Sequence, residues 1–194
     1  MNRIERALKR IIDFIGALVL LIVLSPVFLV IYILQKKDNS GPAIYKQERV
    51  GKGGRHFYIY KFRTMVVDAE KDGVPQLEQN DDPRLTAFGK HLRKKHLDEL
   101  PQLFNVLKGD MSFVGYRPER QYFIDKIMEV NPDYELLFVS KPGITSLATI
   151  LNGYTDTLDK MLIRLQMDLN YLKNRSLLLD AKIVYKTVVA QLNS

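Results

Sequence analysis

An apolar run from Ile11 to Leu34 lies near the start of this 194-residue chain, and few of its residues are other than apolar: Asp13, Gly16, Ser25, Pro26 and Tyr32. The run exceeds the roughly 18 residues that make a membrane-spanning helix a candidate. It is too long for a cleaved signal peptide, and no small-x-small cleavage site follows it. We therefore expect the segment to lie in a membrane.

A helix break falls inside this run. Pro26 removes a backbone donor and clashes with the preceding turn, so it kinks or breaks a helix. The part before the break rises about 21 Å and the part after Pro26 about 12 Å. Neither part alone crosses a hydrocarbon core of ~30 Å. The backbone carbonyls freed at the break need donors, and the Ser25 hydroxyl is one candidate.

Basic residues flank the run at both ends: Arg3, Arg6, Lys9 and Arg10 before it, Lys36 and Lys37 after it. By the positive-inside rule both ends are cytoplasmic, which a spanning helix cannot satisfy. We therefore favour a re-entrant helix that breaks at Ser25–Pro26 and returns to the same face. A single-pass anchor is the alternative. Asp13 is expected to pair with Arg10 or Lys9 at the headgroup level.

The rest of the chain predicts a mixed, helix-rich α/β fold. Residues 43–47 and 56–65 are β-prone, and the turn at Gly51–Gly54 predicts a hairpin between them. The glycines also suit a phosphate cradle, but they lack the spacing of a known phosphate-binding loop. Polar residues 72–83 are typical of a surface loop. Apolar spacing and stop signals predict helices over residues 86–97, 101–107, 158–173 and 178–192.

This pattern divides the chain into two parts. Residues 1–38 form the re-entrant membrane helix with its basic flanks, and residues 39–194 form a small cytoplasmic catalytic domain. The last two helices are amphipathic and are expected on or near the membrane surface.

Composition narrows the classes of function. The chain has no cysteine, which excludes disulfides, zinc–thiolate sites and cysteine nucleophiles, and three histidines make a histidine-rich metal centre improbable. The net charge of +7 suits anionic partners such as phosphate ligands, acidic lipids or nucleic acid. The basic stretch Arg93–Lys95 is compatible with nucleic acid binding. Its place beside an acidic pair and behind a membrane segment argues against a nucleic acid partner.

The acidic pair Asp98–Glu99 stands just before Pro101, where a helix is expected to begin. One interpretation is structural: an N-cap and a first-turn acid that match the helix dipole. The other is chemical, because an ionised carboxylate can attack phosphorus and adjacent acids suit Mg²⁺. Arg93 precedes the pair and Arg117 follows it, and converging guanidinium groups absorb charge in phosphoryl transfer.

The chain resembles the bacterial sugar transferase family, the monotopic phosphoglycosyl transferases. The resemblance runs nearly end to end and rests on an ordered set of segments: Lys9–Phe14, Ser25–Pro26, Gln47–Gly51, Tyr60–Met65, Leu97–Gln102, Asn105–Gly115 and Lys141–Thr145. Two places depart from the family pattern. Tyr116 stands where the family usually has proline, and residues 146–154 differ from the usual sequence.

This resemblance implies a specific reaction. Such enzymes move a sugar-1-phosphate from a UDP-sugar to undecaprenyl phosphate and release UMP, at the cytoplasmic face of the bacterial inner membrane. It implies that Asp98 is the nucleophile and that Glu99 assists Mg²⁺ or proton handling. Lys61, Arg93 and Arg117 match positions around the phosphates, Ser25 and Pro26 match the membrane break, and a homodimer is compatible. The alternative is a catalytically silent, membrane-anchored scaffold of the same fold.

Overall fold

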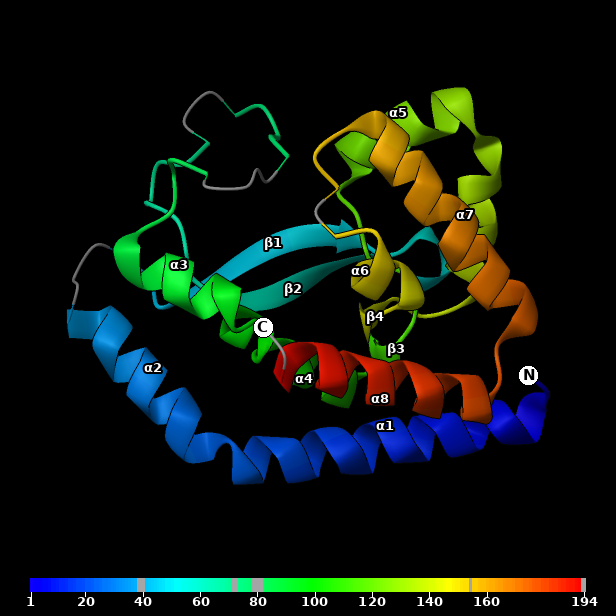
Figure 1. Cartoon of the computed structure of the whole chain (residues 1–194), viewed down its shortest axis with the longest axis horizontal. Helices are drawn as coiled ribbons and strands as arrows, with labels where there is room; N and C mark the ends of the chain where they lie inside the picture. The colour runs from blue at the N-terminus through cyan, green and yellow to red at the C-terminus, as the bar shows by residue number, and fades with distance from the viewer. Residues whose placement is uncertain (38–40, 71–72, 78–81, 154, 193–194) are drawn as a thin grey trace.

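A computed structural model describes residues 1–37, 41–70, 73–77, 82–153 and 155–192 (Figure 1). Its architecture is mixed and helix-rich, as expected, with two small sheets. The helices are α1 (Arg3–Val23), α2 (Ser25–Lys37), α3 (Ala87–Lys94), α4 (Gln102–Lys108), α5 (Gln121–Val130), α6 (Leu147–Leu151), α7 (Leu158–Asn174) and α8 (Leu177–Leu192). The strands are β1 (Ile44–Val50), β2 (His56–Phe62), β3 (Ser112–Val114) and β4 (Gly143–Thr145), and the 3₁₀ helices are η1 (Lys52–Gly54), η2 (Leu97–Glu99) and η3 (Pro132–Val139).

Strands β1 and β2 form the predicted hairpin. They pair antiparallel from Ile44 opposite Phe62 to Val50 opposite His56. The turn η1 places Gly53 and Gly54 at φ of +70° and +71°, a backbone region that side chains with a Cβ rarely adopt. The hairpin prediction is therefore confirmed, and the glycines have a conformational reason to be there.

Helices α1 and α2 form one rod that bends by 61° at the expected break. The Ser25 hydroxyl donates a hydrogen bond to the carbonyl of Ile22 over 2.8 Å, as the sequence predicts. Within the described residues, no single helix has the length and apolar character to cross a membrane, but the bent pair passes that test jointly. Most of its large apolar side chains are exposed, including Ile11, Val19 and Leu29. The bend is thus present, and both a re-entrant loop and a broken span have this shape.

The expected pairing of Asp13 with Arg10 or Lys9 is wrong. Asp13 is buried and accepts a hydrogen bond from the Phe113 backbone N–H at 3.2 Å. Lys9 pairs with Asp180 of α8 at 2.6 Å. Arg10 donates to the last carbonyls of α4, as described below. Helix α1 packs against α4 and β3, so these side chains find partners across the fold rather than along the helix.

The first half of the apolar run is also part of the protein core. Ala17 is fully buried in a cluster with Ile59 of β2, Leu103 and Val106 of α4, and Met111. Helix α1 therefore buries one face against the rest of the molecule and leaves its other apolar side chains exposed. Because α1 is packed into the core, any surface that binds its exposed apolar face also lies close to the rest of the chain.

The short parallel pair of strands β3 and β4 was not predicted. Ser112 pairs with Gly143 and Val114 with Thr145. The two backbones meet very closely beyond the pair, because a Cβ on Gly115 would lie 2.5 Å from the Lys141 carbonyl oxygen. Glycine is the residue type that permits this approach. The pair fixes the start of the segment that carries Arg117.

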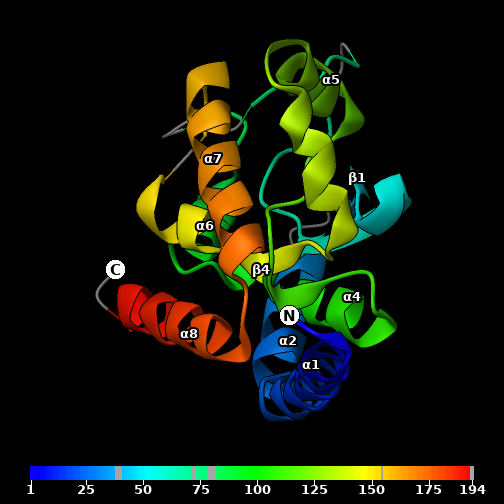
Figure 2. The same cartoon turned by 90° about the vertical axis from the view of Figure 1, so that its right-hand side faces the viewer.

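The helices that follow the hairpin lie at two levels (Figures 1 and 2). Helices α5 and α7 stand together above the strands, and α8 lies at the level of α1 (Figures 1 and 2). The largest core cluster takes its residues from β1, α5, η3, α7 and the segment after β3: Val50, Tyr116, Phe123, Ile124, Ile127, Tyr134, Leu137, Met161, Leu165 and Leu169. The predicted helices are confirmed as α3, α4, α7 and α8. In the expected loop, residues 73–77 have no regular structure, and residues 72 and 78–81 lie outside the described part.

Candidate active site

A cavity of about 520 Å³ opens between the hairpin, the α3–η2 segment, the segment after β3 and the start of α7. The sequence-predicted residues all line it: Lys61, Arg93, Asp98, Glu99 and Arg117. They come from widely separated parts of the chain, so the fold brings together what the sequence spreads over more than fifty positions. The roles of these residues remain predictions.

The acidic pair does not cap α4. Asp98 and Glu99 lie in the separate 3₁₀ turn η2, and the cap residue of α4 is Pro101, which makes no side-chain capping bond. The preceding His96 adopts a left-handed conformation at φ of +48°, an uncommon one for a residue with a Cβ. This tight turn aims the pair at the cavity. The structural interpretation as an N-cap is therefore wrong in its geometry.

Asp98 is 5% exposed, so its carboxylate is largely withdrawn from bulk water although it lines the cavity. Glu99 is only a little more open, and its environment is strongly cationic. The Lys61 ammonium lies 2.9 Å from Glu99 Oε1, and an Arg117 guanidinium nitrogen lies 3.6 Å from the same oxygen. Burial alone would raise the pKa of Glu99, but Lys61 and Arg117 hold it well below its usual range. Glu99 is therefore a carboxylate at all ordinary pH values.

Arg93 reaches the cavity from the last turn of α3. Its Nε donates to the buried Thr64 hydroxyl at 3.0 Å. The bond orients the guanidinium plane, which presents donors in a fixed fork that matches phosphate geometry. Arg93, Lys61 and Arg117 thus bring three cations to the wall around the acidic pair.

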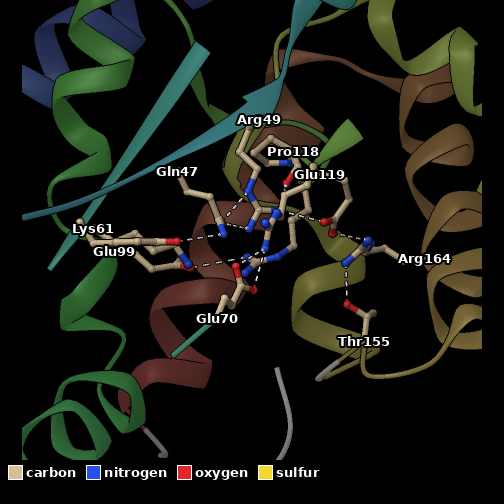
Figure 3. A network of polar contacts seen from close by, with 12 residues as sticks. Gln47, Arg49, Lys61, Glu70, Glu99, Pro118, Glu119, Thr155 and Arg164 are labelled. Atoms are coloured by element: carbon tan, nitrogen blue, oxygen red, sulfur yellow. Dashed lines mark hydrogen bonds and ion pairs between the residues drawn. The ribbon is translucent and has the colours of Figure 1, made fainter. Parts of the chain in front are cut away.

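A second polar network on the same wall was missed by sequence reasoning (Figure 3). Glu119 is buried between Arg49, at 2.8 Å, and Arg164, at 2.6 Å. Arg164 also donates to the Thr155 hydroxyl at 2.6 Å. Arg49 lies in a segment that carries the family resemblance, whereas Arg164 is hidden inside a helix whose spacing suggests only packing. Burial opposes ionisation, yet Arg164, Arg49 and Arg117 keep the pKa of Glu119 below its ordinary value.

The far side of the cavity is closed by another ion pair. One guanidinium nitrogen of Arg120 donates to both carboxylate oxygens of Glu70, at 2.8 and 2.9 Å. The cavity is therefore lined by several arginines with only some of their charge balanced by carboxylates, which suits an anionic ligand of more than one phosphate.

Of the two departures from the family pattern, only residues 146–154 contribute to the lining of this cavity. Tyr116 is 1% exposed and joins the main core cluster, where its ring fills space and leaves Arg117 facing the cavity. Thr149 and Gly153 line the cavity from the other divergent stretch, and Thr155 follows directly after that stretch. Tyr154 lies outside the described residues. The acidic pair itself follows the family pattern.

Comparison with known proteins agrees with this geometry. The model of the bacterial sugar transferase family matches residues 4–194, and the chain belongs to that family. It is similar to the UDP-N-acetylgalactosamine-undecaprenyl-phosphate N-acetylgalactosaminephosphotransferase of Aeromonas hydrophila, with 43% identity over 93% of this chain and 43% of the relative. It is also similar to the UDP-glucose:undecaprenyl-phosphate glucose-1-phosphate transferase of Klebsiella pneumoniae, with 43% identity over 97% of this chain and 41% of the relative.

A third relative has nearly the same length. The exopolysaccharide production protein PSS of Rhizobium leguminosarum bv. phaseoli is 40% identical over 97% of this chain and 96% of its own length. By contrast, the chain spans only about two fifths of the Aeromonas and Klebsiella relatives.

Proposed function

We propose that this chain transfers a sugar-1-phosphate from a UDP-sugar to undecaprenyl phosphate and releases UMP. The observation that carries the proposal is the acidic pair Asp98–Glu99 inside a cavity walled by Lys61, Arg93 and Arg117. Family membership and the activities for which the relatives are named support the same reaction class. The product would be the lipid-linked first intermediate of a surface glycan.

In the first step, an Asp98 carboxylate oxygen attacks the phosphorus that carries the sugar. The bond from that phosphorus to the bridging oxygen breaks, and UMP leaves with the bridging oxygen and its electron pair. An aspartyl phosphosugar remains. In the second step, an oxygen of undecaprenyl phosphate attacks the same phosphorus, which returns Asp98 as a carboxylate. Nucleophilic catalysis of this type splits one difficult displacement into two easier ones.

The surrounding side chains have distinct tasks in this scheme. Glu99 offsets only one of the two positive charges of Lys61 and Arg117, so this group keeps a net positive charge that can attract an arriving diphosphate. Arg93 is oriented by Thr64 to meet phosphate oxygens. Cations that absorb the charge of a transferring phosphoryl group are a large part of catalysis in such reactions.

Mg²⁺ fits this donor set. Among the described residues no group of three or more acidic, histidine or cysteine side chains could hold a metal. Mg²⁺, however, is often bound through one or two carboxylates plus substrate phosphates, which the pair Asp98–Glu99 can provide. When bound, Mg²⁺ would neutralise charge on the phosphates during transfer.

The membrane arrangement belongs to the same proposal. The exposed apolar face of α1 and α2 would lie in the cytoplasmic face of the bacterial inner membrane, with the chain entering and leaving on that face. The lipid tail of the acceptor could then stay in the bilayer while the UDP-sugar arrives from the cytosol. The cavity and the apolar rod belong to one packed unit, which supports delivery of both substrates to one place.

UMP release tests the proposal. The purified chain is supplied with undecaprenyl phosphate, Mg²⁺ and a panel of UDP-sugars, with Asp98→Asn as the control. We expect UMP from at least one UDP-sugar and none from the variant. Equal UMP release by Asp98→Asn would overturn the assignment of the nucleophile. The absence of UMP with every sugar would favour a silent scaffold.

A further inference from the structure

A second cavity, of about 460 Å³, lies between the hairpin turn and the C-terminal end of α4. Lys52, Arg55 and Phe57 line it from the hairpin, and Gly109, Asp110 and Lys141 line it from the other side. None of these residues lines the catalytic cavity. The second cavity is therefore a separate feature that the proposed reaction does not use.

Positive charge predominates in this second cavity. Lys52, Arg55 and Lys141 bring three cations, and Asp110 brings the one carboxylate among the lining residues. In the part of the chain that the structure describes, none of the three cations forms an ion pair with a carboxylate. Lys52 and Arg55 are exposed at the hairpin turn, and Lys141 is partly buried. Unbalanced cations around a concave surface attract anions strongly.

The need to stabilise the end of α4 does not account for these cations. Arg10 already donates to the Val106 and Leu107 carbonyls, at 2.6 and 2.8 Å, and so satisfies that helix end. Lys141 adds a further charge beside it. Burial lowers the pKa of Lys141, and Arg10 and Lys52 lower it further, against the opposite effects of Asp13 and Asp110. Lys141 thus lies among like charges and, within the described residues, forms no direct ion pair with these carboxylates.

Glycine positions keep this cavity open. A Cβ on Gly109 would lie 3.2 Å from Lys141 Nζ and 3.3 Å from an Arg10 guanidinium nitrogen, so a larger residue would crowd the cations. At the mouth, a Cβ on Gly53 or Gly54 would meet nothing within 4 Å. The hairpin turn therefore leaves its backbone accessible beside Lys52.

We propose that this second cavity binds a phosphate group, held by Lys52, Arg55 and Lys141. Phosphate suits the site because it carries up to two charges and several acceptor oxygens for converging donors. The phosphate could belong to an anionic lipid headgroup or to a soluble phosphate. Arg10 adjoins the cavity at the start of the apolar run, so lipid headgroups would be within reach. The inference does not depend on the proposed reaction.

The test measures how fast the Lys141 side-chain amine reacts with a labelling reagent. The chain in a non-ionic detergent is treated briefly with an amine-reactive reagent, and labelling of each lysine is measured by peptide mass spectrometry. The reaction is repeated with inorganic phosphate, with phosphatidylglycerol vesicles and with phosphatidylcholine vesicles. Exposed Lys126 on α5 serves as the internal reference, since it does not line this cavity.

We expect several-fold slower labelling of Lys141, and not of Lys126, with a phosphate ligand. Protection by inorganic phosphate would identify a soluble source, and protection only by phosphatidylglycerol would identify a headgroup. The Lys52→Gln/Arg55→Gln variant should need a several-fold higher ligand concentration, whereas Lys126→Gln should behave like the parent. No protection, equal protection of Lys126, or equal protection by phosphatidylcholine would overturn the proposal.

Discussion

Two neighbouring carboxylates in this site have different surroundings. Glu99 lies against Lys61 and Arg117, and these two cations lower its pKa, so its carboxyl group stays ionised. Asp98, one residue earlier, is buried at the cavity wall. A carboxylate that serves as nucleophile must reach phosphorus, whereas one that anchors cations need not. In the proposed mechanism Asp98 is the nucleophile, and Glu99 positions Lys61 and Arg117.

Replacement of Lys61 tests this division at the residue scale. Lys61→Gln removes the 2.9 Å ion pair and one phosphate-facing cation. We expect UMP formation to fall about 10²-fold, which corresponds to about 2.7 kcal/mol of transition-state stabilisation. Steady-state UMP release measures it. Lys46→Gln, on the neighbouring strand, is the matched control and should retain the parent rate. An unchanged rate in Lys61→Gln would contradict the assigned role.

Asp168 gives a prediction about pH. Burial raises the pKa of Asp168 from 3.8 to about 7, although Arg164, the Arg117 backbone and the Ser146 side chain act in the opposite direction. Between about pH 4 and 7 the folded chain holds a proton that the unfolded chain has lost. Asp168 therefore makes the free energy of unfolding fall as pH rises through this window, by up to ~1.4 kcal/mol per pH unit.

The Asp168→Asn variant should lack this contribution. The unfolding temperature of the variant minus that of the parent should increase from pH 4 to pH 7. Above pH 7 this difference should stay constant. Thermal unfolding in detergent across pH 4–8 measures the difference. Asp125→Asn, an exposed carboxyl on α5, is the control. A parent-minus-variant difference that is flat with pH would refute the raised pKa.

At the element scale, the bend between α1 and α2 decides how the chain meets a membrane. The bend of 61° coincides with Ser25–Pro26, and the Ser25 hydroxyl donates a hydrogen bond to the Ile22 carbonyl at the break. A proline-induced kink of this kind keeps backbone groups satisfied where water is scarce. The bend is compatible with two arms that return to the same face, which the basic flanks predict.

Cysteine labelling tests the path of the chain. The protein has no native cysteine, so Arg3→Cys and Lys37→Cys can each carry a single thiol. Both positions are exposed at the outer ends of the two helices. A membrane-impermeant maleimide should label neither variant in spheroplasts and both after lysis. Labelling of one variant alone in intact spheroplasts would show a spanning helix.

The close approach of β3 and β4 gives another prediction for an element. In Gly115→Ala, the new Cβ would lie 2.5 Å from the Lys141 carbonyl oxygen, a backbone atom that cannot move alone. We expect a loss of about 1–3 kcal/mol in stability and displacement of Arg117. Gly16→Ala meets only a Phe113 ring, at 2.9 Å, and should cost less. The unfolding temperatures of the two variants measure this difference. Equal unfolding temperatures would contradict the close approach of the two backbones at Gly115.

Over the whole molecule, the features visible in the sequence are local ones. The hairpin, the break at Ser25–Pro26 and helices α3, α4, α7 and α8 follow from turn residues and apolar spacing. Strands β3 and β4 have three residues each and pair across a long separation, so no periodicity marks them. The buried Glu119 with its two arginines was missed for the same reason.

The candidate site shows the same division. The acidic pair and three cationic residues, Lys61, Arg93 and Arg117, were predicted from the sequence, and the fold brings these five residues to one cavity. The partners of Asp13 and Lys9 were wrong because tertiary contacts with Phe113 and Asp180 replaced the expected neighbours on the helix. Interactions along the chain can be anticipated, whereas choices among distant partners depend on packing.

The central claim is that Asp98 becomes covalently linked to a phosphosugar. Mass spectrometry of the chain after incubation with its UDP-sugar and Mg²⁺, without the lipid acceptor, tests this most directly. We predict a sugar-phosphate adduct on the peptide that contains Asp98, with about one UMP released per chain, and chase of the adduct by undecaprenyl phosphate. UMP release only when acceptor is present, with no adduct on Asp98, would contradict the account.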